Sequence, residues 1–436
     1  MRVIPHATCV ECGCLCDDIE LTVDQTRIVE AKNACELGQK WFLQSLEPQA
    51  ARTCRVRGEP ADLDTAIAEA ARLLHEAAFP LVYGLTESTC EGQRIGVALA
   101  DRIGACLDTA TSIHHGPSGV SFPDIGEVTC SLGEVKNRAD LVIFWGVDPI
   151  ASHPRHAERY SLDARGLFIP EGRKDRYAVH VDARPSVAPE QYDCSLIIPP
   201  GKDFEVLWAL RALVKGVPVG SDFEKQTGVA LADLIHLAGR MKACHFGVLF
   251  IGMGLSRSAG RHMNNEAALG LVTDLNDHTR FFAKTMKVKG NGTGADNVLL
   301  WQTGYPFAVH LGQGYPRYNP GEFSAVESLE RSEPDAALII GADPQTDFPF
   351  KAAARLQAIP TIALDFRDTE TMRRATVAIP TAAYGLQTGG TVYRMDDVSL
   401  PLRPALPSIH PSQAEVLGKI DHAVHRLQAA QAPAIG

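Results

Sequence analysis

A repeated pattern of three apolar runs constrains the fold of this chain more than any other feature of its sequence. In two places an apolar run ending in Gly-x-Asp-Pro is followed by one ending in Asp-x-Arg and then by one ending in Pro. The runs are residues 141–149, 177–184 and 195–199 in the first unit, and 337–344, 361–367 and 375–380 in the second. The same motifs in the same order predict two related units of buried strands.

Stretches with helical periodicity, such as residues 63–78 and 203–214, lie beside these runs and favour strand-helix-strand crossovers. Residues 80–84 and 247–252 are typical of the opening strands of the two units. The predicted fold class is therefore α/β, with two Rossmann-like parallel-sheet halves related by an internal repeat, plus a small Cys-rich N-terminal lobe. The predicted divisions are an N-terminal lobe at 1–55, Rossmann-like domains at 56–240 and 241–380, and a C-terminal extension at 381–436.

Composition excludes several classes of function. The 436 residues are 45% hydrophobic and 22% charged, which is ordinary for a globular protein large enough for two or three domains. The net charge is −10 and the Lys and Arg residues are dispersed, so we expect no nucleic-acid partner. The sequence has neither a run of about 18 apolar residues nor a basic start followed by an apolar run, so we expect a cytoplasmic protein with no membrane segment.

The N-terminal cysteines have the spacing of a metal site. Cys9, Cys12 and Cys16 lie in one turn-rich stretch, and Cys35 comes from a returning segment, which leaves Cys14 as a spare thiol. Four thiolates in this pattern can hold a [4Fe-4S] cluster, and soft sulfur ligands also suit zinc. A third alternative is that these cysteines hold no metal.

Carboxylates end four of the predicted strands, at the sheet edge where ligands bind in α/β folds. These carboxylates are Asp148, Asp182, Asp343 and Asp365. An Asp at such a position can accept hydrogen bonds from a ribose or a guanine. It can equally cap the next helix or form an Asx turn.

Two glycine-rich segments are candidates for phosphate binding. Gly252 and Gly254 follow a predicted strand directly, and Arg257 adds a guanidinium, as at a pyrophosphate site. The third glycine of the dinucleotide motif is missing there. Residues 289–294 also contain three glycines, but their pattern favours a structural turn.

Histidines mark another candidate site. His114 and His115 precede a Gly-Pro pair, and Arg155 lies in a His-Pro-Arg-His segment just after the first Gly-x-Asp-Pro motif. Both segments follow an α/β unit and can converge on one cleft, with imidazoles and a guanidinium near a small anionic substrate. The alternative is that the histidines hydrogen-bond loop backbone.

Several motifs along the chain together carry a family resemblance. They lie at residues 9–19, 115–117, 132–140, 153–160, 301–309, 314–322 and 389–396. With them the chain resembles, over nearly its whole length, the B subunit of formylmethanofuran dehydrogenase, a member of the molybdopterin oxidoreductase superfamily. The resemblance implies tungsten or molybdenum between two pterin guanine dinucleotides, one for each Rossmann-like half, and a cubane cluster in the N-terminal lobe.

The resemblance also implies a metal-ligating Cys or selenocysteine just before His-Gly-Pro, where this chain has His114. A neutral imidazole supplies neither the charge nor the softness of a thiolate. We therefore expect the tungsten or molybdenum pterin to be absent, and the dinucleotide-site residues to be vestigial. His114, His115 and Arg155 would be remnants of a catalytic site.

One branch of the family fits this departure. The chain is similar to the B subunit of the formyltransferase/hydrolase complex of methylotrophic bacteria, which implies a noncatalytic scaffold in tetrahydromethanopterin-linked oxidation of formaldehyde to formate. The implied partners are an amidohydrolase-like hydrolase subunit, a formyltransferase subunit and a further structural subunit, in a complex that carries a methanofuran-like formyl carrier.

Two alternatives stay open. One is an active tungsten or molybdenum pterin subunit that interconverts CO2 and formate, with His114 or a sulfido ligand in place of the Cys. The other is an electron-relay module in which only the N-terminal cluster works.

Overall fold

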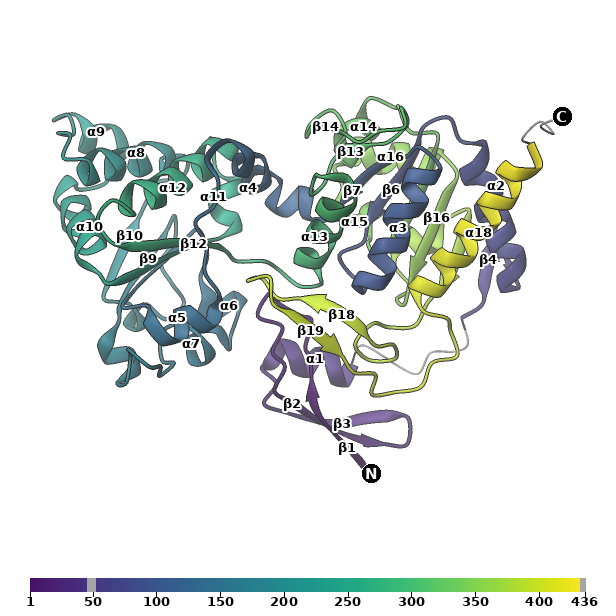
Figure 1. Cartoon of the computed structure of the whole chain (residues 1–436), viewed down its shortest axis with the longest axis horizontal. Helices are drawn as coiled ribbons and strands as arrows, with labels where there is room; N and C mark the ends of the chain where they lie inside the picture. The colour runs from purple at the N-terminus through teal and green to yellow at the C-terminus, as the bar shows by residue number, and fades with distance from the viewer. Residues whose placement is uncertain (45–51, 432–436) are drawn as a thin grey trace.

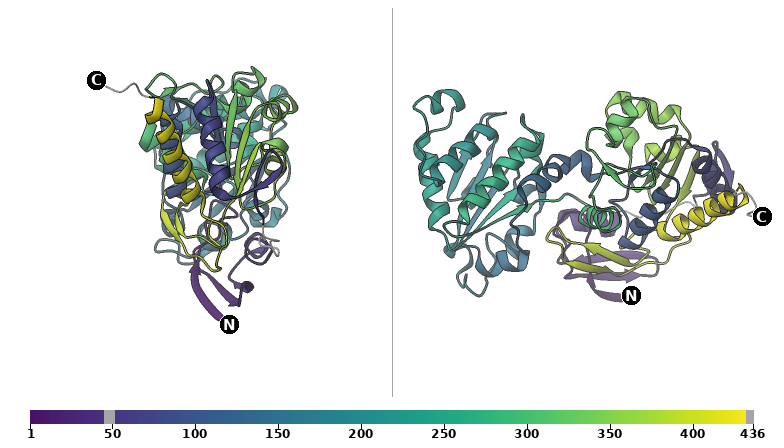
Figure 2. Two further views of the ribbon diagram at one scale, coloured as in Figure 1. Left: turned by 90° about the vertical axis from the view of Figure 1, so that its right-hand side faces the viewer. Right: turned by 45° about the horizontal axis from the view of Figure 1, so that its top comes forward.

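The computed structural model describes residues 1–44 and 52–431 of the chain, and the side chains of all of these except residue 114. They form a small N-terminal lobe and two α/β bodies, each built around its own sheet (Figure 1). Helix α4 (Thr111–Ile125) lies between the two bodies, as Figure 1 and the right-hand view of Figure 2 show.

One body contains a five-stranded sheet of order β10-β9-β8-β11-β12, in which all pairings are parallel. Its strands are β8 (Leu141–Trp145), β9 (Tyr177–Asp182), β10 (Cys194–Ile197), β11 (Phe246–Ile251) and β12 (Arg280–Thr285). Every residue of β8 and β11 is buried, as expected of parallel strands covered on both faces.

Short and long helices cover this sheet. They are α5 (Leu132–Arg138), α6 (Pro149–Ser152), α7 (His156–Arg159), α8 (Asp203–Val214), α9 (Phe223–Thr227), α10 (Leu231–Ala243), α11 (Met253–Arg257) and α12 (His262–Leu275), with two 3-10 turns at Gly172–Asp175 and Pro189–Gln191. Ser131 and Glu134 form a capping box that fixes the start of α5.

The other body contains a nine-stranded sheet of order β14-β13-β7-β6-β15-β16-β17-β4-β5. Its strands are β4 (Cys54–Val56), β5 (Glu59–Ala61), β6 (Pro80–Gly84), β7 (Cys106–Thr109), β13 (Val309–His310), β14 (Arg317–Tyr318), β15 (Ala336–Ile340), β16 (Thr361–Asp365) and β17 (Val377–Pro380). Its helices are α2 (Leu63–Glu76), α3 (Cys90–Arg102), α13 (Gly292–Thr303), α14 (Ala325–Glu330), α15 (Pro344–Asp347), α16 (Phe350–Ala358), α17 (Glu370–Arg374) and α18 (Gln413–Gln431).

The predicted α/β class is confirmed, but the prediction of two purely parallel halves holds only in part. The five-stranded sheet is parallel, and so is the central run β7-β6-β15-β16-β17 of the larger sheet. The outer pairs β13-β14 and β4-β5 join that run in antiparallel fashion, which makes the nine-stranded sheet mixed. These added strands have two or three residues each, too short for a clear periodicity in the sequence.

The repeated motifs form equivalent three-strand blocks, β8-β9-β10 in one sheet and β15-β16-β17 in the other. Their expected opening strands are exchanged, however. β6 pairs with β15 of the second repeat, and β11 pairs with β8 of the first. The chain leaves the larger body after β7, completes the smaller sheet and then returns.

The predicted ranges 56–240 and 241–380 therefore do not follow the sheets, because the smaller body is an insertion between β7 and β13 of the larger one. The predicted C-terminal extension is also part of a body, since α18 packs against α2 and α3. It includes the antiparallel hairpin of β18 (Gly390–Tyr393) and β19 (Ser399–Leu402).

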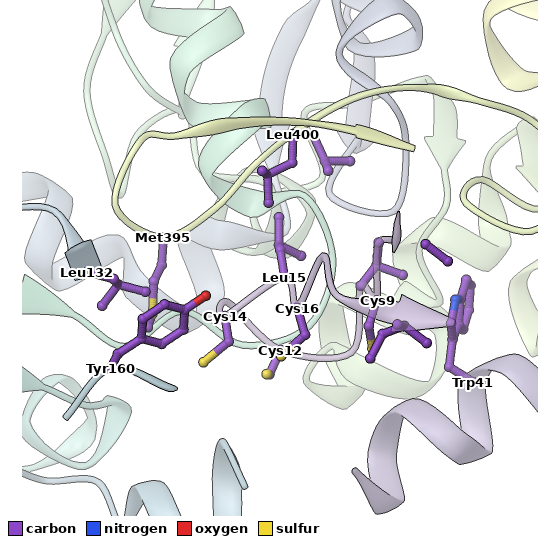
Figure 3. Packing of buried hydrophobic residues seen from close by; sticks show 14 of the residues in the cluster. Cys9, Cys12, Cys14, Leu15, Cys16, Trp41, Leu132, Tyr160, Met395 and Leu400 are labelled. Carbon is purple, nitrogen blue, oxygen red and sulfur yellow. The ribbon is translucent and has the colours of Figure 1, made fainter. Parts of the chain in front are cut away.

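The N-terminal lobe is an antiparallel sheet of β1 (Arg2–Ala7), β2 (Ile19–Asp24) and β3 (Arg27–Lys32), followed by α1 (Glu36–Gln44). Its buried cysteines and Leu15 belong to a hydrophobic core that also contains residues of the five-stranded body and of the β18-β19 hairpin. Figure 3 shows Leu15 pointing toward Leu400 of β19, while the sulfurs of Cys12 and Cys14 point away from it. Within residues 1–44 and 52–431, none of the helices has the length and apolar composition needed to cross a membrane.

Candidate functional site

The four predicted ligand cysteines line one small cavity in the N-terminal lobe. Cys9, Cys12, Cys16 and Cys35 contribute to its wall together with Arg155. A backbone hydrogen bond from Cys9 N to Cys16 O, 2.9 Å long, closes the loop between β1 and β2, and Cys35 lies immediately before α1. The fold thus brings both segments of the predicted cysteine set together.

Burial shifts the pKa values of the thiols in this loop. Burial raises the pKa of Cys9, and burial raises the pKa of Cys16 to about 11. A hydrogen bond with Cys14 lowers the pKa of Cys12 and raises that of Cys14, which does not line the cavity. Soft thiolates at four corners of a cavity are donors for an iron-sulfur cluster.

The arrangement is not that of a closed single-ion site. Among the residues that the structure describes, no group of three or more His, Cys, Asp or Glu side chains is positioned to hold one metal ion. A structural zinc site would require its four ligands in tight tetrahedral contact. The iron-sulfur cluster therefore stays a prediction for this cavity.

Two larger cavities lie between and beside the bodies. The large cavity, of about 590 Å³, is lined by α4, the end of β12, α13 and the segment before β13. The strand-end cavity, of about 300 Å³, lies at the carboxyl ends of β6, β15 and β16. Thr111, His115 and Lys287 line both, so the two cavities share a wall formed by the start of α4 and the segment after β12.

Lys287 connects this shared wall to the cysteine loop. Its carbonyl accepts a hydrogen bond from Gly13 N at 3.0 Å and one from His153 Nε2 at 2.8 Å. Since a carbonyl only accepts, His153 carries its proton on Nε2, and burial lowers the pKa of this histidine to about 4. The Lys287 ammonium lies 3.0 Å from Asp296, whose pKa is raised by burial against the opposing effect of Lys287. The cysteine loop and the cavities thus meet at one residue.

Asp108, at the carboxyl end of β7, fixes the surroundings of this wall. Its carboxylate accepts hydrogen bonds from Ser112 Oγ at 2.7 Å, Ala325 N at 2.8 Å and Ala308 N at 3.1 Å. Ala308 has a positive φ of 50°, an uncommon conformation that this hydrogen bond helps to hold. Burial raises the pKa of Asp108 to about 7.

The four strand-end aspartates have structural hydrogen bonds. Asp148 caps α6 through Ile150 N and also accepts from Ser186 Oγ, while Asp343 accepts from the backbone and hydroxyl of Thr371. Asp182 makes an Asx turn with Arg184 N, and Asp365 pairs with Arg367. Of the four, only Asp343 lines the strand-end cavity.

The glycine segment after β11 is explained by close packing. A Cβ at Gly252 would lie 2.3 Å from Gly146 O, and one at Gly254 would lie 2.6 Å from the same atom. Gly254 N already donates to Gly146 O at 2.9 Å. These glycines let the end of β8 approach α11, and Arg257 lines a separate cavity on the other side of α4.

The histidine segments converge only in part. His153 reaches Lys287, but Arg155 does not reach His115. Its guanidinium lines the cysteine cavity and bonds Asp18 at 2.7 and 2.8 Å. His115 is buried at the shared wall. Sequence reasoning missed Lys284, Lys287, Asp296 and Asp108, although Asp108 and Lys284 lie at the carboxyl ends of parallel strands, where ligands of α/β folds bind.

The structural class follows from the architecture: two α/β bodies have cavities at their strand ends, and a cysteine lobe contacts the wall of those cavities. The chain has the fold of molybdopterin-dependent oxidoreductases. It aligns with acetylene hydratase from Pelobacter acetylenicus at a TM-score of 0.72 and 11% identity, over 97% of this chain and 69% of that one. It also aligns with a chain of the formyltransferase/hydrolase complex of Methylorubrum extorquens, solved with methylofuran, at a TM-score of 0.72 and 24% identity, over 86% of this chain and 100% of that one.

Sequence comparison identifies the family within this class. The chain is 42% identical over 413 residues to the B subunit of the tungsten-containing formylmethanofuran dehydrogenase 2 of Methanocaldococcus jannaschii, covering 93% of this chain and 94% of the relative. The corresponding protein of Methanococcus maripaludis is 37% identical, over 96% of this chain and 98% of the relative. The chain therefore belongs to the family of formylmethanofuran dehydrogenase B subunits. No model of a known protein family matches it.

The B subunit of the formyltransferase/hydrolase complex of Methylorubrum extorquens is a more distant relative. It is 28% identical, over 66% of this chain and 74% of its own length. These similarities favour the alternative left open by the sequence, a tungsten-type subunit, over the scaffold that was its main interpretation.

Proposed function

We propose that this chain is the redox-centre subunit of a formylmethanofuran-dehydrogenase-type complex that interconverts CO2 and formate. The observation that carries the proposal is the contact at Lys287, where the loop of the four-cysteine cavity meets the shared wall of the two larger cavities. Electron transfer requires a cluster site beside a substrate site, whereas a passive scaffold requires neither. The full-length similarity to tungsten-containing subunits supports the same conclusion.

The reaction sets what the residues must do. CO2 takes up two electrons and one proton to give formate, so the site must admit a neutral gas and hold a monoanion. Cys9, Cys12, Cys16 and Cys35 would hold the cluster that carries the electrons. Lys287 would present a positive charge to the anion, and Asp296 orients its ammonium.

A tungsten or molybdenum pterin centre would supply the two-electron chemistry when bound. Thr111, His115 and Lys287, which line both cavities, are the residues that would lie beside it. The protein ligand is where the fit fails, because position 114 is a histidine and no cysteine of the described residues lines either cavity.

Metal analysis of the intact complex, combined with a dye assay, tests the proposal. We expect about one tungsten or molybdenum per chain, and formate-dependent reduction of a viologen dye that is lost when the metal is removed. A complex that contains neither metal and does not reduce the dye would contradict it.

The histidine at position 114 favours a second candidate, a noncatalytic scaffold of a formyltransferase/hydrolase complex. Its partners would be a hydrolase subunit resembling amidohydrolases, a formyltransferase subunit and a further structural subunit, with a methanofuran-like carrier in the complex. The same measurements separate the two candidates, because the scaffold predicts formyl transfer and hydrolysis without tungsten or molybdenum.

A further inference from the structure

Lys284 is a buried lysine that faces the large cavity. It is the penultimate residue of β12, its side chain is 3% exposed, and it forms part of the cavity wall. Within residues 1–44 and 52–431 the structure shows no side-chain hydrogen bond or close ion pair of Lys284, although the charge of Lys284 acts on the Glu127 carboxyl in the same cavity wall. A buried ammonium without a hydrogen-bonding partner is costly, so its presence in a cavity wall indicates a ligand with acceptor atoms and a negative charge.

The other charged groups of the cavity are already engaged or acidic. Lys287 pairs with Asp296 at 3.0 Å, and Asp397 accepts a hydrogen bond from Asn297 at 3.0 Å. Glu127 remains, and its pKa is raised by burial, against the opposing effects of Lys284 and Lys287. Within the described part of this wall, Lys284 is thus a cation without a hydrogen-bonded carboxylate, whereas Lys287 already has Asp296.

We propose that Lys284 is a substrate-positioning residue that binds the carboxylate of a one-carbon acid in the large cavity. This inference rests on the proposed function and adds to it a binding residue for formate, beyond the shared wall at His115 and Lys287. The ammonium donates charge-assisted hydrogen bonds to the carboxylate and holds it in the large cavity, which the shared wall closes on one side.

The surroundings favour a small monoanion over a phosphate. Lys284 compensates the single charge of formate but only one of the two charges of a phosphate dianion, and Glu127 in the same wall adds no further compensation. Much of the remaining wall is apolar, including Phe122, Leu300 and Phe307. Such a wall lets neutral CO2 pass, while Lys284 retains its charged counterpart.

Amine labelling of the intact complex, read by mass spectrometry, tests the site without relying on catalysis. We expect millimolar formate to slow acylation of Lys284 and to leave unchanged that of Lys225, an exposed lysine of α9 that serves as control. Protection by inorganic phosphate but not by formate would overturn the carboxylate assignment. Protection by neither anion would overturn the site.

Substitutions supply the second arm. Lys284→Met should raise the KM for formate at least about tenfold while kcat changes less, since a charge-assisted hydrogen bond of the ground state is lost. Lys284→Arg should restore most of the affinity, and Lys225→Met should behave as the parent. An unchanged KM in Lys284→Met, or an equal rise in Lys225→Met, would contradict the proposal.

The two arms separate failure of this inference from failure of the proposed function. A complex without formate-dependent dye reduction contradicts the proposed function, and the labelling arm still decides whether Lys284 binds formate. A complex that reduces the dye but shows no protection of Lys284 contradicts this inference alone.

Discussion

Asp108 joins α4 and the segment before β13, which line the cavities, to α14. Its carboxylate accepts from Ser112 at the start of α4, from Ala308 beside the large cavity and from Ala325 at the start of α14. All of these contacts are buried or partly buried. The position of His115, three residues after Ser112, therefore depends on one carboxylate.

The variant Asp108→Asn should destabilise the protein and loosen this wall. The Asp108 carboxylate has two oxygens that accept from Ser112, Ala308 and Ala325, whereas an asparagine amide has a single acceptor oxygen. Its NH2 group would face a backbone N–H and could not accept from it. We expect a loss of about 1–3 kcal/mol in the free energy of unfolding, measured by urea denaturation. Ser112→Ala, which removes a single hydroxyl donor, should cost less.

The pH dependence of that stability has a definite sign. Burial raises the pKa of Asp108 from 3.8 to about 7 in the folded protein. The folded state therefore binds the proton more tightly, and the stability contributed by this group is complete below pH 4 and is lost as the pH rises to about 7. Asp108→Asn should remove this contribution to the dependence of the free energy of unfolding on pH. A variant whose unfolding free energy keeps the parent's full slope between pH 4 and 7 would contradict the assignment.

Sequence patterns predicted the roles of single residues less well than they predicted strands. The strand-end aspartates were open between ligand and cap, and Asp148 and Asp343 turned out to have their oxygens engaged by backbone and hydroxyl donors. Lys284 and Lys287 carried no motif, because their position depends on where β12 ends relative to α4. That relation between distant segments is tertiary and leaves no local periodicity.

At the scale of elements, α4 determines how the cavities are divided. It carries Gly116 and Gly119 one turn apart, and these two glycines differ sharply in their surroundings. A Cβ at Gly119 would lie 2.3 Å from Cε1 of the buried Phe307, whereas a Cβ at Gly116 would have no atom within 4 Å. Close approach of α4 to the segment before β13 thus requires glycine at 119 and not at 116.

The matched pair Gly119→Ala and Gly116→Ala tests this packing. Gly119→Ala should destabilise the protein by about 1–3 kcal/mol, because the Phe307 ring is enclosed and either α4 or residues 305–308 must shift. Gly116→Ala should be neutral or stabilising by up to about 1 kcal/mol, since alanine favours helix. Thermal unfolding of both variants gives the comparison, and equal effects would refute the proposed contact.

Strands were predicted well wherever burial on both faces produced continuous apolar runs. β8, β9, β15 and β16 lie at the predicted positions for this reason. The β4-β5 and β13-β14 pairs were missed, because two or three residues carry no pattern.

At the scale of the whole molecule, the main error was one of connectivity. β6 and β11 were correctly predicted as strands, but each lies beside the repeat that is distant from it in sequence. Short-range patterns cannot specify which parallel neighbours meet when the chain leaves one sheet and later returns. The consequence is functional, because α4 and the segment after β12 are the two crossings between the bodies, and together they form the shared wall of the cavities (Figure 1).

The cysteine lobe completes the assembly at this same crossing. Gly13 N bonds Lys287 O, and Gly13 O accepts from Met395 N at 3.1 Å, so the cysteine loop is tied to both the crossing and the β18-β19 hairpin. A cluster in the lobe would therefore stabilise the contact between lobe and bodies as well as carry electrons.

Replacing single cysteines in the intact complex tests that cluster. Cys12→Ala removes a sulfur from the cavity wall, so we expect loss of bound iron and of a broad visible absorption that dithionite bleaches. Cys14→Ala is the matched control, because Cys14 is also buried in the same loop but lies outside the cavity lining, and its variant should keep both signals. Iron retained in Cys12→Ala, or lost equally in both variants, would contradict the ligand assignment. Zinc in place of iron in the parent complex would show that the four thiols close around a single ion, in which case the proposed electron transfer from the lobe fails with it.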